Sequence, residues 1–312
     1  MNNLKLKKFV EENPRLVTRK ESTRYPGLFV LKYAKRVFYD NLWSESVILN
    51  ECRGLVVDEN YETVCRPFTK IFNYHEEGAG DSWKDDDTVL ITKKINGFMA
   101  GLTKVKDQAI VSTTGSLDSE FVDMAKEYLD KIPLKSLAPY YTYMFEICHP
   151  NDPHIIEEVP GAHLLAIVEH DTGLTHYKFD KTDLMVATIA DFKNIESIIT
   201  SDDDDTYYSC KFGDVKKEVA KCRHEGFVIV NPLTDETLKI KSPYYLFKKF
   251  LARVSTDKLI MWIKSGEVKR RIEEEYYPVL ENLNTYGLEN FTELKEQERL
   301  DLLRGWIEQL QQ

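Results

Sequence analysis

Lys94 is the first residue of this sequence whose neighbours suggest a chemically reactive side chain. Lys94 follows an apolar, β-branched run at 88–91, which predicts a buried strand. Asn-Gly at 96–97 then leads into a second apolar run, 98–105, and Asn-Gly between two such runs is typical of a β-hairpin. The pattern predicts a Lys94 held beside a tight turn. An amine held in this way becomes a nucleophile when burial or neighbouring cations lower its pKa.

Two glutamates occur in segments that otherwise have the character of apolar strands. Glu146 lies within 141–148, where residue types alternate as in a strand, and Glu225 opens the apolar run 226–230. A carboxylate left charged and alone in a core is costly. Each glutamate is therefore expected to be paired, to bind a ligand or to face a cleft.

Two lysines follow Glu225 after a turn at 231–236. In the strand expected at 237–242, Lys239 and Lys241 share one face because alternate residues of a strand point the same way. Two cations beside a carboxylate make a site suited to a phosphate and a metal ion. An exposed strand with an ordinary cross-strand ion pair is the alternative.

Three further cations lie in the first quarter of the chain. Arg53 stands at the entrance of a strand expected over 51–59, and Arg66 and Lys70 lie in the loop-like stretch 66–73. Basic side chains are mostly exposed, so residue type alone predicts three exposed charges at strand ends.

The elements that must position these residues are mainly strands up to residue 245 and helices after it. Further strands are expected at 27–33, 36–39, 109–115, 163–168 and 175–179, and helices at the amino terminus, from Ser116 or Asp118 to 128, and at 214–223, with helical and loop material at 181–200. The tail predicts helices at 246–254, 257–263, 267–280 and 290–310, the last with an apolar stripe of Leu300, Leu303, Ile307 and Leu310. The fold class is therefore α+β, with an antiparallel-sheet domain over 1–245 and a small all-α domain over 246–312.

Composition and charge argue against a broadly basic surface, a disulfide-bonded chain and a membrane-spanning protein. The chain has 312 residues, 42% hydrophobic content and a net charge of −10, so it can bury a sizeable core, and any nucleic-acid contact must be local. Five cysteines without paired spacing indicate reduced thiols. No apolar run approaches membrane-spanning length and no signal peptide is expected. The acidic run 202–205 is typical of a solvated loop.

The order of these pieces resembles the motif series of the covalent nucleotidyltransferases, which include RNA ligases, DNA ligases and mRNA capping enzymes. The matching pieces are Lys94-x-x-Gly97, Phe145-Glu146, Glu225-Gly226 and Lys239-Ile240-Lys241. Three longer stretches, 51–54 (ECRG), 66–73 (RPFTKIFN) and 238–242 (LKIKS), narrow the resemblance to the phage RNA ligase 1 family. It extends from about residue 27 to 246, and the first domain is then a nucleotidyltransferase domain.

The resemblance implies an ATP-dependent RNA ligase that joins 5′-phosphate and 3′-hydroxyl ends in RNA repair. Lys94 would form lysyl-AMP with ATP, and the AMP would pass to the RNA 5′-phosphate before the 3′-hydroxyl displaces it. By the same resemblance Lys239 and Lys241 would grip the α-phosphate, and Glu225 would hold Mg²⁺. Glu146 would read the ribose or support the metal, and Arg53 and Lys70 would orient the pyrophosphate.

Two departures from the family pattern are visible. Asn96 stands where family members often carry Asp, and Thr114 lies where the family can place a lysine. No phosphate-binding Gly-x-x-x-x-Gly-Lys-Ser/Thr loop occurs, which argues against an appended kinase domain.

Other readings stay open at this point. A DNA ligase or a capping guanylyltransferase usually carries an oligonucleotide-binding barrel after the last lysine motif, whereas helices are expected here. A non-catalytic RNA-binding protein of the same fold is the more distant reading. The expected partner is RNA with the two ends named above, a nicked tRNA being one candidate, with a separate end-healing kinase/phosphatase as a candidate protein partner. No membrane partner is expected, and the expected location is the cytoplasm, or the host cytoplasm for a viral protein. Tail cations, Lys248, Lys249, Arg253 and 269–271, are candidates for contacting the RNA backbone.

Overall fold

The chain folds into two compact units, each assembled from two stretches of sequence. The computed structural model describes residues 2–177, 208–253, 255–272 and 276–309. One unit comprises Met1–Lys70 and Asn96–Tyr207, and the other Ile71–Ile95 and Tyr208–Gln312. The stretch 181–200 and the acidic run 202–205 lie outside the described residues. The domain boundary expected near residue 245 stays a prediction, and the helices that follow it belong to the second unit.

Two β-sheets make up most of the first unit. A four-stranded antiparallel sheet has the order β1-β2-β3-β4, and a five-stranded antiparallel sheet has the order β11-β10-β9-β7-β8. The strands are β1 (Val17–Glu21), β2 (Phe29–Tyr33), β3 (Arg53–Val57), β4 (Thr63–Cys65), β7 (Phe98–Val105), β8 (Gln108–Thr113), β9 (Tyr141–Cys148), β10 (Gly161–Glu169) and β11 (Thr175–His176). The strands expected at 163–168 and 175–179 are confirmed as β10 and β11, which pair with each other up to His176; residues 178 and 179 lie outside the described residues.

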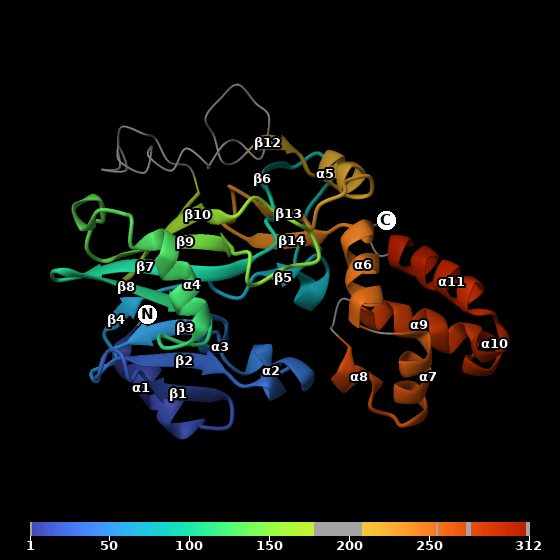
Figure 1. Ribbon diagram of the computed structural model, residues 1–312, viewed down its shortest axis with the longest axis horizontal. Helices are drawn as coiled ribbons and strands as arrows, with labels where there is room; N and C mark the ends of the chain where they lie inside the picture. Colours follow the sequence, from blue (N-terminus) through green and yellow to red (C-terminus); the bar gives the residue numbers. More distant parts are fainter. Residues whose placement is uncertain (1, 178–207, 254, 273–275, 310–312) are drawn as a thin grey trace. The chain divides into compact units, whose positions relative to one another are not determined.

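One amphipathic helix covers the five-stranded sheet. Helix α4 (Glu120–Leu129) buries Val122, Ala125 and Leu129 against Ala100, Leu102 and Phe145 of the sheet, among other core residues (Figure 1). Spacings of three and four residues place these apolar side chains on one side of the helix. Its N-cap is Ser119, one residue beyond the later of the two positions expected from the sequence.

A second five-stranded sheet organises the other unit. Its order is β12-β6-β13-β14-β5, antiparallel except for the β14–β5 pair. The strands are β5 (Phe72–Asn73), β6 (Thr88–Lys93), β12 (Tyr208–Lys211), β13 (Gly226–Val230) and β14 (Thr237–Lys241). Helix α5 (Phe212–Val219) packs Phe212, Val215 and Val219 on Ile229 and other buried residues of one sheet face (Figure 1).

Helices follow β14, as the sequence predicts. They are α6 (Pro243–Arg253), α7 (Thr256–Lys264), α8 (Val268–Arg271), α9 (Tyr277–Tyr286), α10 (Leu288–Glu293) and α11 (Glu296–Gln309) (Figure 1). Leu303 and Ile307 of the expected stripe are fully buried, Leu300 is half-buried, and Leu310 lies outside the described residues. The single helix expected at 267–280 is wrong: α8 ends at Arg271, and α9 begins beside Pro278, a residue that favours the first turn of a helix.

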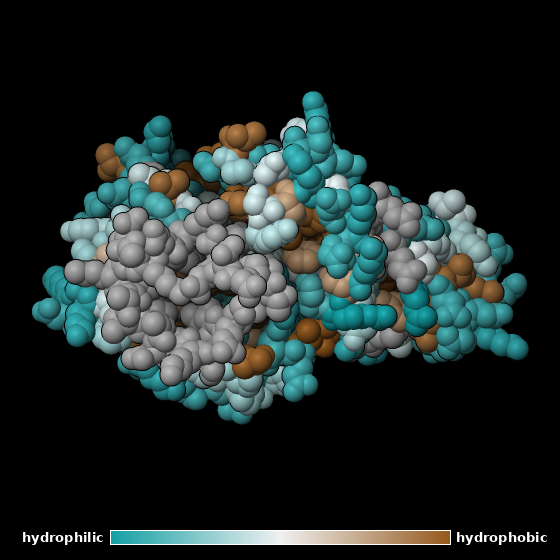
Figure 2. Space-filling model, turned by 90° about the horizontal axis from the view of Figure 1, so that it is seen from above, coloured by the Kyte–Doolittle hydropathy of each residue, from teal (hydrophilic) through white to brown (hydrophobic). Residues whose placement is uncertain are grey.

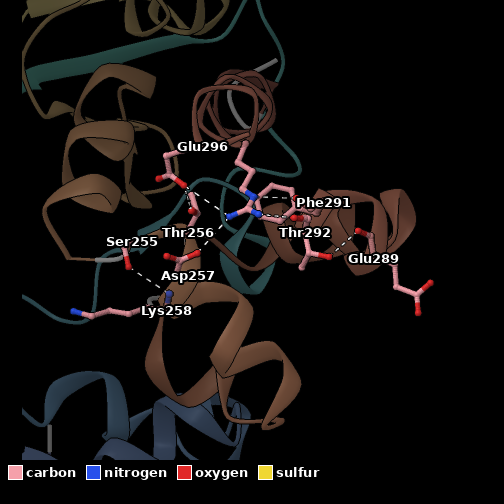
Figure 3. A network of polar contacts seen from close by, with 9 residues as sticks. Ser255, Thr256, Asp257, Lys258, Glu289, Phe291, Thr292 and Glu296 are labelled. Atoms are coloured by element: carbon pink, nitrogen blue, oxygen red, sulfur yellow. Dashed lines mark hydrogen bonds and ion pairs between the residues drawn. The ribbon is translucent and has the colours of Figure 1, made fainter. Parts of the chain in front are cut away.

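A polar network joins the tail helices to one another (Figure 3). Arg299 of α11 donates to the carbonyl oxygens of Phe291 and Thr292, and it forms an ion pair with Asp257 of α7 at 3.3 Å. Thr256 donates to a carboxylate oxygen of Glu296 from the same α7 terminus. These bonds add side-chain donors to backbone carbonyl oxygens at the end of α10, where a helix leaves its last carbonyl groups without partners further along the helix.

Three further expectations are wrong. The single helix expected at 290–310 is interrupted at residues 294–295, between α10 and α11. Residues 36–39 lie in helix α2 (Lys35–Tyr39), not in a strand. The hairpin around Asn96-Gly97 does not form, because β6 and β7 pair in different sheets. The remaining elements are α1 (Asn3–Glu12), α3 (Ile48–Glu51) and the 3₁₀ turns Trp43–Glu45, Glu76–Gly78 and Leu134–Ser136.

The glycine of the Asn-Gly pair serves a close contact. A Cβ atom at Gly97 would lie 2.3 Å from the carbonyl oxygen of Ile147 in β9, and Gly97 does not have the positive φ of the favoured hairpin turn. Glycine at position 97 is therefore required here by packing against β9 and not by turn geometry.

The surface and the thiols agree with the composition. All five cysteines are free, and Cys52, Cys65 and Cys148 are buried. Among the described residues no helix is long and apolar enough to cross a membrane. On the face seen in Figure 2, hydrophobic side chains occur in small groups among hydrophilic ones.

Candidate active site

Lys94 and Glu225 form an ion pair at one end of the second unit's sheet. The Nζ of Lys94 donates to Oε2 of Glu225 at 3.0 Å. The Glu225 side chain is 3% exposed and that of Lys94 is 23% exposed, so the amine can be reached while the carboxylate is enclosed. The backbone N–H of Lys94 donates to the carbonyl oxygen of Gly226 at 2.8 Å, which continues the β6–β13 ladder by one residue beyond Lys93.

The two motif lysines share the sheet face on which Lys94 lies. Thr92 of β6, Val228 of β13 and Lys239 of β14 are opposite one another across the three strands, and Gly226 is opposite Lys241. Directly opposed residues of neighbouring strands lie on the same face. Lys94 is opposite Gly226 by its hydrogen bond, and therefore it belongs to this face.

The other face of the sheet is apolar. Leu238 and Ile240, which alternate with the two lysines, are at most 2% exposed and pack in the core beneath α5. Lys93 is opposite Phe227, another residue of that core, and so begins on the side away from Lys94. The alternation expected from the sequence for Lys239 and Lys241 is confirmed.

Gly226 permits the close approach of β13 and β14 beside Glu225. Its φ of +138° is in the region that favours glycine, and a Cβ atom would lie 2.0 Å from the carbonyl oxygen of Ile240. The narrow spacing sets Glu225 at the strand entrance, where its carbonyl oxygen accepts the N–H of Ser242 at 2.8 Å. In the sequence, Gly226 stands out only as the residue after Glu225 in a motif; the structure shows that it has a steric role.

Ser242 is a positioning residue that sequence reasoning missed. It is fully buried, its hydroxyl donates to the carbonyl oxygen of His224, and its oxygen accepts the N–H of Tyr245 at 3.1 Å. The same side chain therefore begins α6 and holds the segment that enters β13. A serine directly before the first apolar residues of a helix is the signal from which this cap was predictable.

Glu146 lies in the first unit, in the middle strand of its five-stranded sheet. It is 9% exposed, and its Oε1 accepts the backbone N–H of Gly97 at 3.0 Å. The carboxylate expected to need a partner therefore has one, which holds the chain after Asn96 against β9. Asn96 is also buried, and its Oδ1 accepts the N–H of Ile156 at 2.9 Å.

Arg53 contacts a residue that is opposite Glu146 in the first unit. Its Nη1 lies 3.9 Å from the sulfur of Met99, and Met99 is directly opposite Glu146 across β7 and β9. The next residue, Gly54, has a φ of +96°, and a Cβ atom there would lie 2.7 Å from the Cα of Thr114. Glycine is therefore required between Arg53 and the remainder of β3.

Lys70 and Arg66 are buried, whereas residue type predicted exposed charges. The Lys70 ammonium lies 5.1 Å from the ring centroid of Trp43 and 5.9 Å from that of Phe38. Its backbone N–H donates to the carbonyl oxygen of Asn50 at 2.8 Å. Aromatic faces attract a cation, and this attraction offsets part of the cost of removing the ammonium from water.

Arg66 makes a two-pronged ion pair with Glu51. Nη2 and Nε of Arg66 donate to Oε1 and Oε2 of Glu51 at 2.9 and 3.2 Å, and Nη1 donates to the carbonyl oxygens of His170 and Asp171. The arginine is 4% exposed. This pair ties the segment before Arg53 to the segment that carries Lys70.

The predicted site residues therefore divide between the units. Lys94, Glu225, Lys239 and Lys241 belong to the second unit, where the first two are in contact and all three lysines share a face. Arg53, Lys70 and Glu146 belong to the first. Their assigned roles remain predictions.

A divalent cation suits the donor set if phosphate oxygens complete it. Among the described residues, no three His, Cys, Asp or Glu side chains form a ready-made metal site. Mg²⁺ usually binds through one or two carboxylates, substrate phosphates and water, and Glu225 supplies one enclosed carboxylate beside two phosphate-binding candidates. The residues fit Mg²⁺ held together with a nucleotide; they do not fit a metal bound by protein groups alone.

Solved structures share the fold at low sequence identity. Two forms of an archaeal ATP-dependent RNA ligase match with TM-scores of 0.56 and 0.55 at 14% and 15% identity, covering 96% and 99% of this chain and 76% and 77% of theirs. A putative ATP-dependent DNA ligase from Aquifex aeolicus matches with a TM-score of 0.51 at 12% identity, covering 97% of this chain and 77% of its own. This likeness establishes the nucleotidyltransferase fold and does not separate RNA from DNA ligases.

A comparison with protein-family models distinguishes an RNA ligase from a DNA ligase. A search of curated protein sequences gives no match. The model of the phage RNA ligase 1 family, described as RNA ligase, matches residues 51–245. The match spans both the ECRG stretch and the Lys239–Lys241 strand, and it covers more than half of the chain. This chain belongs to the phage RNA ligase 1 family.

Proposed function

We propose that the protein is an ATP-dependent RNA ligase that seals RNA through a lysyl-AMP intermediate on Lys94. The observation that carries the proposal is the Lys94–Glu225 contact of 3.0 Å on the sheet face that also bears Lys239 and Lys241. One accessible amine, one enclosed carboxylate and two further cations are the groups that a phosphoryl transfer with a lysine nucleophile needs.

The first transfer makes the covalent intermediate. The neutral Nζ of Lys94 attacks the α-phosphorus of ATP, a N–P bond forms, and the bond from that phosphorus to the bridging oxygen breaks to release pyrophosphate. Lys239 and Lys241 stabilise the charge that develops on the α-phosphate oxygens. Glu225 would hold Mg²⁺, which when bound would neutralise negative charge on the phosphates.

The charges around Lys94 act in opposite directions. The carboxylate of Glu225 favours the ammonium form, which has no free electron pair, whereas two lysines on the same face favour the neutral amine. The amine must therefore leave its contact with Glu225 before it attacks.

The two remaining transfers join the RNA ends. An oxygen of the RNA 5′-phosphate attacks the phosphorus of lysyl-AMP, and the N–P bond breaks to return the Lys94 amine. The RNA 3′-hydroxyl then attacks the activated 5′-phosphate, and AMP leaves as the phosphodiester forms. A nicked tRNA, an end-healing kinase/phosphatase partner and a cytoplasmic location are parts of this proposal.

A labelling experiment tests the proposal. The full chain is incubated with Mg²⁺ and either α-labelled ATP or GTP and is run on a denaturing gel. Label from ATP alone supports a ligase, label from GTP alone supports a capping enzyme, and no label supports a non-catalytic RNA-binding protein. Joining of a nicked RNA, but not a nicked DNA, by the labelled enzyme separates the RNA ligase from the DNA ligase.

Two lysine variants test the nucleophile. Lys94→Ala is expected to abolish the label, because it removes the partly exposed amine that contacts Glu225 at 3.0 Å. Lys93→Ala is the matched control: it removes a neighbouring lysine on the opposite strand face and is expected to keep the label. Normal labelling of Lys94→Ala with loss in Lys93→Ala would move the nucleophile by one residue and refute the assignment.

A further inference from the structure

Two exposed cations lie over one tyrosine ring at the start of the helical tail. The guanidinium carbon of Arg223 lies 5.0 Å, and the Nζ of Lys248 5.1 Å, from the ring centroid of Tyr244. Tyr244 and Lys248 are four residues apart on α6 and so share one face of the helix. Arg223 comes from a different segment, the connection between α5 and β13.

The backbone around these residues is held in place from within the unit. The hydroxyl of Ser242 donates to the carbonyl oxygen of His224, next to Arg223, and the same oxygen accepts the N–H of Tyr245, next to Tyr244. One buried side chain therefore fixes both segments that carry the cations. The arrangement is built by the fold and does not depend on a flexible loop.

Neither cation has a carboxylate partner. Within the described part of the chain, no Asp or Glu lies within ion-pair distance of Arg223 or Lys248, although the chain has 52 acidic residues and 42 basic ones. Lys221, two residues before Arg223, is also exposed. On a chain of net charge −10, positive side chains gathered without a counter-charge form a local attractive site for an anion.

The cluster of Arg223, Tyr244 and Lys248 adjoins the lysines of the proposed active site. Lys241, which shares its sheet face with Lys239, lies 5.7 Å from the ring centroid of Tyr245. Lys249 lies 5.6 Å from the same centroid. Adjacent tyrosines at the start of α6 thus order two sets of cations, one beside the proposed phosphate-binding strand and one exposed to solvent.

We propose that Arg223, Tyr244 and Lys248 form a docking site for the phosphodiester backbone of the RNA substrate. Both cations lie over the tyrosine ring, so Tyr244 orders the charges and is not an open platform for stacking a base. Contacts to phosphates orient a strand without reading its sequence. The site therefore binds RNA of any sequence, and it rests on the proposed function because RNA is the substrate there.

Of the tail cations singled out in the sequence, only Lys248 enters this site. Lys249 is 5% exposed, Arg271 is paired with Glu267 at 3.1 Å, and Lys269 lies over the ring of Tyr277. Arg270 is exposed on a different helix, α8. The side chain of Arg253 lies outside the described residues. The proposed RNA contact therefore lies at the junction between the tail and the sheet that carries Lys239 and Lys241.

The salt dependence of RNA binding tests the proposal. The full chain without ATP is titrated into a fluorescein-labelled, 5′-phosphorylated single-stranded RNA of mixed sequence, and anisotropy gives the dissociation constant between 50 and 200 mM salt. Each phosphate neutralised on a single strand adds about 0.7 to the slope of log K against log salt concentration. The double variant Arg223→Gln/Lys248→Gln is expected to lower that slope by about 1.4 and to weaken binding about 25-fold at 0.1 M salt.

A charge-matched control is available on α7. Lys258 and Lys264 are exposed lysines of the same unit, and Lys258→Gln/Lys264→Gln removes the same formal charge. It is expected to keep the wild-type slope. An equal loss in this control, or an unchanged slope in Arg223→Gln/Lys248→Gln, would show a general charge effect or a solvated helix face and overturn the docking site.

Enzyme–AMP formation with ATP alone separates this inference from the proposed function. If the wild-type chain forms enzyme–AMP but Arg223→Gln/Lys248→Gln binds RNA as tightly as the wild type, the proposed function stands and the docking site is refuted. If the wild-type chain forms no enzyme–AMP, the proposed function is refuted. Loss of enzyme–AMP in Arg223→Gln/Lys248→Gln, with cooperative melting retained, would instead assign these cations to the ATP site.

Discussion

His170 makes the stability of the first unit depend on pH. The imidazole is 5% exposed, and its Nε2 lies 3.0 Å from Oγ1 of Thr142 and 3.4 Å from Oγ1 of Thr103. The Thr142 oxygen accepts the backbone N–H of Arg66 at 2.8 Å, which leaves its own hydrogen for Nε2. This donor suits a neutral ring that accepts at Nε2.

Burial lowers the pKa of His170 from 6.5 to about 4; the neighbouring Arg66 charge acts in the same direction, and Asp171 and the Tyr141 carbonyl act against it. The unfolded chain takes up a proton at this residue near pH 6.5, whereas the folded chain does so only near pH 4. Stability is therefore fully present above pH 6.5 and is lost as the pH falls from 6.5 to 4. A difference of this size amounts to about 3 kcal/mol, of which about 2 kcal/mol is lost by pH 5.

Calorimetric melting of the wild type and of His170→Gln between pH 7.5 and 5 measures this loss. The variant loses the packing and the hydrogen bond of the buried imidazole, so it is expected to melt below the wild type at pH 7.5. It cannot titrate at this position, so the gap in melting temperature is expected to narrow as the pH falls. About 2 kcal/mol corresponds to a narrowing of at least about 4 °C for a unit of this size. A constant gap between pH 7.5 and 5 would refute the buried neutral histidine.

Two further perturbations follow from the packing. Gly226→Ala is expected to abolish enzyme–AMP formation, because the added Cβ would lie 2.0 Å from a backbone oxygen and would displace Glu225. Gly305→Ala on α11 is the control, because its Cβ would have no atom within 4 Å. It is expected to keep activity and to raise stability by up to about 1 kcal/mol. Normal labelling of Gly226→Ala would contradict the steric role. Arg66→Met is expected to cost about 3–5 kcal/mol, because it leaves the Glu51 carboxylate without its partner, and Glu51→Gln in the same chain is expected to recover part of that loss in a double-mutant cycle of melting temperatures. Strictly additive effects would show that the pair is not coupled.

Local sequence determined the parts of the site that depend on strand periodicity. Lys239 and Lys241 alternate with Leu238 and Ile240, and a period of two places the lysines together whenever the apolar pair is buried. Lys94, Glu225 and this strand were recognisable in order, because each motif is short and adjoins an apolar run. The resemblance to RNA ligases rested on that order, and the family comparison confirmed it.

Tertiary structure alone decided which strands are neighbours and which charges are buried. Asn96-Gly97 has the local signature of a hairpin, yet β6 and β7 pair in different sheets, and Gly97 is needed for its contact with Ile147. Arg66 looks like an exposed cation, yet its partners Glu51, His170 and Asp171 arrive from distant parts of the chain. Contacts of this kind depend on long-range pairing, and no window of local sequence contains both partners.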